Sequence, residues 1–149
     1  MDEKTFTLID FQKANPGEKK DAFDYIHLII QMKEIPVEFV LCLAKLFAPT
    51  LKISDGLVFL EETFDLEEYK KHLSEGMESS EAQYWMNLVY VNGVFEDLRY
   101  EDAVELAQKI CPVWNLNIEN NETSGVGKAR VLLDSCLEEV CLTIDQYRE

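Results

Sequence analysis

The stretch Val140-Cys141-Leu142-Thr143-Ile144 decides the fold class, because the class depends on whether this stretch forms a strand or a helix. Its β-branched residues favour a strand. Val131 and Leu133 alternate in the same way upstream, and the two runs would be joined by a turn around Asp134–Glu138. Helical spacing is also present, at Leu133, Cys136, Leu137, Val140, Cys141 and Ile144, so a helix stays open. We predict a hairpin of two strands.

A second apolar run, Leu57-Val58-Phe59-Leu60, follows the turn residues Asp55-Gly56. Four apolar residues in a row are consistent with a strand that is buried on both faces. We therefore expect the C-terminal hairpin to pair with residues 57–62 in a small antiparallel sheet.

Apolar residues recur every three to four positions in five segments, near residues 22–30, 37–47, 66–75, 82–93 and 103–114. This spacing predicts five helices. Asp65 and Ser80 are expected to cap the third and fourth helices, and Pro112 is expected to kink or end the fifth.

The polar connections complete this interpretation. Residues 5–11 are predicted to be a short strand or an arm, and the polar residues 119–128 a flexible loop. The fold class that follows is α+β, with about five helices packed on a small antiparallel sheet in a single domain over residues 1–149.

The ends and the hydropathy indicate the compartment. The charged residues 1–4 lead into no apolar segment of the kind a secretory signal requires. No uninterrupted apolar run approaches the roughly 18 residues of a membrane span. We expect a cytoplasmic protein that does not bind membranes.

The charge is strongly negative: Lys and Arg number 14, Asp and Glu number 29, and the formal net charge is −15. Nucleic acids and anionic membranes need a cationic surface, so neither is an expected partner. Residues 55–118 hold 14 acids and 4 bases, so −10 of the net charge lies in this stretch. Such a concentration of acids is typical either of a solvated surface or of a docking face for a basic protein.

Aromatic residues lie beside these acids and are suited to anchor a protein contact. The candidate partner-binding face is Glu61, Glu62, Asp65, Glu67, Glu68, Tyr69, Glu96, Asp97, Tyr100, Glu101 and Asp102.

Other candidate chemistry is weaker. Gly125-Val126-Gly127-Lys128 lacks both the upstream glycine and the following Ser or Thr of a phosphate-binding loop. No zinc-ligand or catalytic spacing is found, so no metal, cofactor or catalytic residue is assigned. Cys42 and Cys111 lie on apolar stripes and are predicted to be buried. Trp85 and Trp114 are interpreted as core residues, with a ligand pocket at Tyr84, Trp85, Asn87 and Tyr90 as the alternative.

The stretch from Gly56-Leu57-Val58-Phe59-Leu60, through Tyr84-Trp85-Met86-Asn87-Leu88-Val89 and Phe95-Glu96-Asp97-Leu98, to Trp114 resembles a loosely defined group of small acidic bacterial proteins. The likeness covers about 60 residues. In size and charge, proteins of this kind resemble immunity proteins, which neutralise toxic nucleases by covering their basic clefts. The resemblance implies a bacterial toxin as partner and transfers no functional residue.

The leading hypothesis is a non-enzymatic acidic protein-binding module, most specifically an immunity-type inhibitor that occludes a basic toxin surface. One alternative is a small metal-dependent hydrolase that uses the carboxylates of residues 61–68 with His72. Another is a scaffold subunit that associates with itself through an apolar surface.

Overall fold

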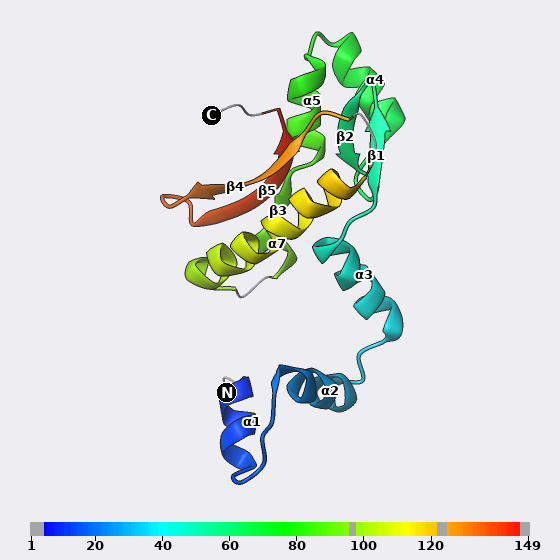
Figure 1. The fold of residues 1–149 in the computed structure, drawn as a ribbon. Coiled ribbons are helices and arrows are strands. Elements are labelled where there is room, and N and C mark those ends of the chain that lie inside the picture. The colour runs from blue at the N-terminus through cyan, green and yellow to red at the C-terminus, as the bar shows by residue number, and fades with distance from the viewer. Residues whose placement is uncertain (1–4, 96–97, 122–124, 147–149) are drawn as a thin grey trace. The chain divides into compact units, whose positions relative to one another are not determined.

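The computed structural model describes residues 5–95, 98–121 and 125–146 (Figure 1). The chain divides into two compact units, unit 1 (Met1–Cys42) and unit 2 (Leu43–Glu149). A compact unit need not be an independently stable domain. The single domain over residues 1–149 therefore stays a prediction.

Unit 1 begins with a helix where a strand or an arm was expected. Thr7 and Asp10 form a capping box: the Thr7 hydroxyl accepts from the Asp10 backbone N–H, and the Thr7 N–H donates to the Asp10 carboxylate. This reciprocal cap satisfies free N–H groups of the first turn and starts α1 (Leu8–Ala14). The expectation for residues 5–11 was therefore wrong, because a local cap outweighed the short apolar run.

The helices α2 (Ala22–Lys33) and α3 (Val37–Phe47) confirm the next two predicted helices. A second capping box, formed by Asp21 and Asp24, starts α2, and Glu34 ends it in the left-handed region at φ 51°. Pro36 precedes α3, and its carbonyl accepts from the N–H groups of Phe39 and Val40.

Unit 2 contains two separate antiparallel sheets. One is the hairpin of β1 (Leu51–Ser54) and β2 (Leu57–Leu60), whose turn residues Asp55 and Gly56 both have positive φ. The other has the order β3-β5-β4, with β3 (Val89–Tyr90), β4 (Lys128–Asp134) and β5 (Glu139–Asp145). The C-terminal hairpin is thus confirmed, with Val131 opposite Leu142.

The predicted pairing of this hairpin with residues 57–62 is wrong. The edge of β2 that would receive it is occupied instead by an amide side chain, Asn87. Asn87 Oδ1 accepts from the Leu60 N–H at 2.8 Å, and its Nδ2 donates to the Val58 and Ile144 carbonyls at 3.0 Å each. One side chain therefore joins β2 to β5 in place of a strand ladder.

Gln83 makes a second link, one helical turn before Asn87. Its Nε2 donates to the carbonyl of Val58 at 3.1 Å and to that of Val126 at 2.7 Å. Val126 in turn pairs with Leu57 in a parallel bridge. A Cβ added at Gly127 would lie 2.8 Å from both Gln83 and Ile144, so this glycine permits a close backbone approach.

Seven helices occur in the described residues, against about five expected. The additional ones are α1 and the single turn α6 (Val91–Val94). Asp65 caps α4 (Leu66–Ser74), as predicted. The expected helix over residues 82–93 instead ends with α5 (Ser79–Met86), because Asn87 turns the chain into β3. Glu78 rather than Ser80 occupies the N-cap of α5.

The helix α7 (Tyr100–Asn120) continues through Pro112, so the predicted end of the helix there was wrong. Polar side chains beyond the proline fix its last turns. Trp114 Nε1 donates to the Leu46 carbonyl at 2.8 Å, and Asn117 Nδ2 donates to the Pro49 carbonyl at 2.7 Å. Asn115 exchanges two hydrogen bonds with the backbone of Ala129. These contacts compensate for the hydrogen bond that proline cannot donate.

The predicted loop at residues 119–128 is shorter than expected. Residues 119 and 120 belong to α7, and residue 128 belongs to β4. Asn115 of α7 donates a hydrogen bond to the Ala129 carbonyl of β4, which fixes the helix and the strand to each other. Residues 122–124 lie outside the described part of the chain.

The core of unit 2 forms where α7 packs on the three-stranded sheet (Figure 1). Its fully buried members include Trp114, Ile110 and Leu142. A second cluster lies beneath α4 and α5 and contains Phe59, Tyr69 and Met86. Among the helices that the structure describes, none combines the length and apolar character needed to cross a membrane.

Replacement of Asn87 by alanine should strongly destabilise unit 2. The change leaves the Leu60 N–H and the Ile144 carbonyl without their Asn87 partner in a dry interior. We expect N87A to lower the free energy of unfolding by about 2–4 kcal/mol, since each unsatisfied buried group costs about 1–3 kcal/mol. Urea denaturation followed by tryptophan fluorescence measures this change. Asn120→Ala, at an exposed position of α7, should alter the free energy by less than about 0.5 kcal/mol. An equal loss in both variants would contradict the proposed role of Asn87.

Candidate functional site

The acidic residues between β2 and the first turn of α4 are exposed, and three of them have local roles. Glu62 Oε1 accepts from the Thr50 N–H at 2.9 Å. Asp65 accepts from the Glu68 N–H as the N-cap of α4. Glu68 lies 3.6 Å from Nε2 of His72, one turn later in the same helix. Glu61 and Glu67 are exposed on the surface.

Tyr69, which the sequence placed on the binding face, belongs to the core. Its side chain is 2% exposed, its ring packs edge-on against Phe59 with ring centroids 5.4 Å apart, and its hydroxyl donates to Asp55 at 2.9 Å. Burial, together with the Asp55 hydrogen bond, raises the pKa of Tyr69 to about 12. The assignment of this residue to the partner surface is therefore corrected, because α4 turns its apolar side onto β2.

The second acidic run does not join the first. Tyr100 is half-buried against the main core, while Glu101 is exposed. Asp102 forms two hydrogen bonds with Arg99, which lower the pKa of its carboxyl group. Figure 1 shows the start of α7 and α4 at opposite ends of unit 2. Glu96 and Asp97 lie outside the described residues.

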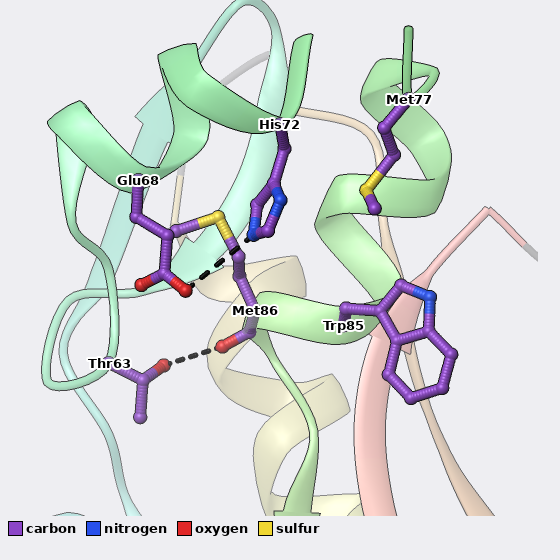
Figure 2. A pocket seen from close by; sticks show the side chains of 6 residues that line it. All are labelled: Thr63, Glu68, His72, Met77, Trp85 and Met86. Carbon is purple, nitrogen blue, oxygen red and sulfur yellow. Dashed lines mark hydrogen bonds and ion pairs between the residues drawn. The ribbon is translucent and has the colours of Figure 1, made fainter. Parts of the chain in front are cut away.

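A hollow of about 470 Å³ lies between α4 and α5. Figure 2 shows the side chains that line it: Thr63, Glu68, His72, Met77, Trp85 and Met86. Thr63 donates to the Met86 carbonyl at 2.9 Å, which ties the loop after β2 to the end of α5. Glu68 and His72 form the polar wall, and the methionines and Trp85 form the apolar one.

Trp85 was interpreted as a core residue, but its side chain is 52% exposed. The buried side chains of α5 are Ala82, Gln83 and Met86. Gln83 and the following Asn87 face inward because their amides bind the strand backbones, and this sets a helical phase that directs Trp85 outward. Hydrophobic spacing alone does not register these two amides, so it gave the wrong helical phase.

Trp85 also borders a second hollow of about 180 Å³ on the side of the three-stranded sheet. Its lining includes Tyr84, Tyr90, Leu133, Asp134 and Glu139. The Tyr84 and Trp85 rings meet edge to face, with centroids 5.0 Å apart. The indole is thus the shared wall of two neighbouring depressions. Of the four residues of the alternative pocket, Tyr84, Trp85 and Tyr90 line this hollow. The fourth, Asn87, is fully buried and does not line it.

Tyr84 is held from behind by a charged pair. The Arg130 guanidinium lies over its ring at 5.7 Å and donates to both oxygens of Asp145. The backbone carbonyl of Tyr84 accepts from the Thr143 hydroxyl at 2.8 Å. These contacts fix the aromatic pair before any partner binds, which reduces the entropy lost on association.

We use the name Trp85 face for the three aromatic residues and three carboxylates that line these hollows: Tyr84, Trp85, Tyr90, Glu68, Asp134 and Glu139. Among the residues that the structure describes, no Lys or Arg lines either hollow, and His72 is the basic side chain present. The face is therefore aromatic at its centre and acidic at its margins.

The hydrolase alternative uses the carboxylates of residues 61–68 with His72. Of the carboxylates in residues 61–68, Glu68 alone lines the hollow beside His72. In the ranges that the structure covers, no group of three or more His, Cys, Asp or Glu side chains could hold a metal ion. Burial raises the pKa of the Cys111 and Cys141 thiols, which disfavours a reactive thiolate. Cys42 and Cys111 were both predicted to be buried, but Cys42 is exposed and Cys111 is half-buried.

No family model, curated protein or solved structure matches the chain.

The burial of Tyr69 predicts a specific loss of stability at high pH. The folded-state pKa of about 12 exceeds the ordinary value of 10.0, so the folded protein favours the neutral phenol. This contribution is complete below pH 10 and disappears as the pH rises toward 12. Wild-type protein should lose more of its free energy of unfolding across this window than Tyr69→Phe, which has no phenol to ionise. Urea unfolding at pH 8 and pH 11 measures the difference, and parallel losses in the two proteins would contradict the assignment.

Proposed function

We propose that this protein is a non-enzymatic, acidic protein-binding module that binds a basic protein through the Trp85 face. The observation that carries the proposal is the half-exposed indole of Trp85 between two depressions with acidic margins. Tryptophan and tyrosine are enriched among the residues that dominate binding energy in protein interfaces. An aromatic centre with a charged rim is the usual arrangement of such contacts.

The charge of the chain supports a basic partner. Glu68, Asp134 and Glu139 lie on the face itself, and the formal net charge of −15 surrounds it with a negative field. Opposite fields accelerate the encounter of two proteins and reject partners of like charge. A basic partner would place its lysine or arginine side chains at the margins and cover Trp85.

The specific form of the proposal is an immunity-type inhibitor of a bacterial toxin. In this form the carboxylates occupy the positions where a nuclease normally binds phosphate groups, and the aromatic residues anchor the complex. Inhibition then follows from occlusion, with no covalent chemistry.

The test starts from capture of a partner by the full chain from a lysate of the source organism at low salt, with W85A as the parallel bait. The captured protein is identified by mass spectrometry, purified, and assayed for nuclease activity with increasing amounts of the wild-type chain. Stoichiometric inhibition supports the inhibitor. Stoichiometric binding without inhibition supports the binding module alone. Equal capture by W85A would contradict the proposed face.

Trp85→Ala should weaken the purified complex by about 30-fold or more, equivalent to about 2 kcal/mol or more, as is typical of a central aromatic anchor. The change should appear mainly in the dissociation rate, since the long-range field is unaffected. Surface plasmon resonance measures both rates. Leu116→Ala, at an exposed apolar position on α7, serves as the matched control and should leave both rates unchanged.

Association should slow as salt rises, because ions screen opposed charges beyond a Debye length of about 10 Å at 0.1 M. The double change Glu68→Gln and Glu139→Gln should reduce the association rate at 50 mM salt and flatten its salt dependence. Glu101→Gln with Glu105→Gln removes the same charge at the start of α7. Stopped-flow mixing compares the pairs, and an equal effect of the α7 pair would place the contact away from the Trp85 face.

A further inference from the structure

The strand β4 is an open edge of the three-stranded sheet. The sheet has the order β3-β5-β4, so one side of β4 pairs with β5, and in the part of the chain that the structure describes no strand lies on its other side (Figure 1). β4 contains no proline, and its register with β5 is continuous over all 7 residues, so no bulge turns the edge away. An edge of this kind is a template for a further strand.

The hydrogen bonds of Asn115 identify the backbone groups that face outward. Asn115 accepts from the Ala129 N–H at 2.8 Å and donates to the Ala129 carbonyl at 3.0 Å, so both groups point away from β5. Backbone groups along a strand face alternate sides, and Val131 and Leu133 therefore present their N–H and C=O groups on the same edge. Among the described residues, neither has a hydrogen-bond partner on that side. Asn115 thus closes the edge at Ala129 and leaves it open beyond.

A hollow lies beside this edge on each face of the sheet. On the α7 face, a hollow of about 600 Å³ is lined by Val131 of β4 and by residues of α7 that include Pro112. On the α5 face, Leu132 and Asp134 line the hollow of about 180 Å³ that belongs to the Trp85 face. Side chains of a strand alternate between the two faces of a sheet. A strand added to β4 would therefore direct its side chains toward the two hollows in turn.

The α7 face beside the open part of the edge suits apolar side chains. The lining of its hollow includes Cys111 and Pro112, which carry no charge. Leu116 and Glu119 also line the hollow, but they follow Asn115 in α7 and lie toward the end of the edge that Asn115 closes. An apolar side chain of the added strand would meet the uncharged end of the hollow.

The α5 face suits basic side chains. Asp134 and Glu139 line its hollow beside the rings of Tyr84 and Trp85, and among the described residues no Lys or Arg lines it. Carboxylates bind ammonium and guanidinium groups through charge-assisted hydrogen bonds, and aromatic rings attract cations. A strand that fits both hollows therefore alternates basic residues with apolar ones.

We propose that β4 accepts an extended segment of the basic partner as an additional antiparallel strand, in which basic residues alternate with apolar residues. Main-chain hydrogen bonds to Val131 and Leu133 supply affinity, and the two hollows select the alternating side chains. In an antiparallel pair, the residues opposite Val131 and Leu133 exchange both hydrogen bonds with them and point to the same face, so these are the apolar residues. The inference rests on the proposed function, because it takes the partner to be basic and bound at the Trp85 face.

The first test uses a short peptide in which lysine and valine alternate, with both ends blocked. Amide hydrogen exchange of the full chain is followed for each residue by NMR. In the free chain, the amides of Val131 and Leu133 should exchange faster than that of Leu132, which faces β5. Saturating peptide should slow the Val131 and Leu133 amides by about 10-fold or more. Amides that stay unprotected with peptide would overturn the proposal. Protection of both amides in the free chain would also overturn it, because a second copy or another part of the same chain would already cover the edge.

Methylated peptides separate main-chain pairing from charge. In the proposed arrangement the valine N–H groups bond to β4 and the lysine N–H groups face away. Methylation of the valine nitrogens should weaken binding by about 10-fold or more, and methylation of the lysine nitrogens should change it by less than about 2-fold. Both peptides keep the same side chains and charge. Equal affinity of the two methylated peptides would overturn the strand pairing.

Variants of the chain distinguish this inference from the binding proposal. Leu133→Pro removes an outward-facing N–H, which an edge strand tolerates, and Leu133→Val is the matched control that keeps the N–H. Leu133→Pro should bind the lysine–valine peptide about 5-fold or more weakly than Leu133→Val. Equal binding by these two variants, with weaker binding by Trp85→Ala, would overturn the strand pairing and support the Trp85 face. Weaker binding by Leu133→Pro, with no change in Trp85→Ala, would support the strand pairing and contradict the Trp85 face.

Discussion

The buried amide of Asn87 is the constraint on which unit 2 depends. It satisfies the backbone of two different sheets at once, with bonds to Leu60 and Val58 on one side and Ile144 on the other. Gln83 adds bonds to Val58 and Val126 one turn earlier. Because unpaired backbone groups are expensive in a dry interior, two small sheets can lie together only if such bridges are complete.

These amides also determine what the surface presents. Their hydrogen bonds fix which side of α5 faces the strands. With that side buried, Trp85 lies outside the core, at the boundary between two hollows. Tyr84 is then held by Arg130 and Asp145 on the neighbouring sheet. The internal polar network and the external aromatic face are two sides of one short helix. A change at the inner side, at Asn87 or Gln83, should therefore disturb the outer side as well.

Charge is distributed unevenly along the chain. Residues 1–42 carry a formal net charge of −3, and residues 43–149 carry −12. Both apolar core clusters also lie in unit 2. A charged rim favours fast and selective encounter, so the acidic margins of the Trp85 face suit the proposed binding of a basic partner.

The sequence by itself determined the local elements. β-branched residues predicted the C-terminal hairpin, Asp65 predicted the start of α4, and apolar spacing predicted α2, α3 and α7, because each of these depends on contacts a few residues apart. Only the tertiary structure decided how they combine. The pairing of the strands, the continuation of α7 through Pro112, the burial of Tyr69 and the exposure of Trp85 all depend on polar partners far away in the sequence. Hydrophobic periodicity is silent on such partners, since it treats every amide and hydroxyl as solvent-facing.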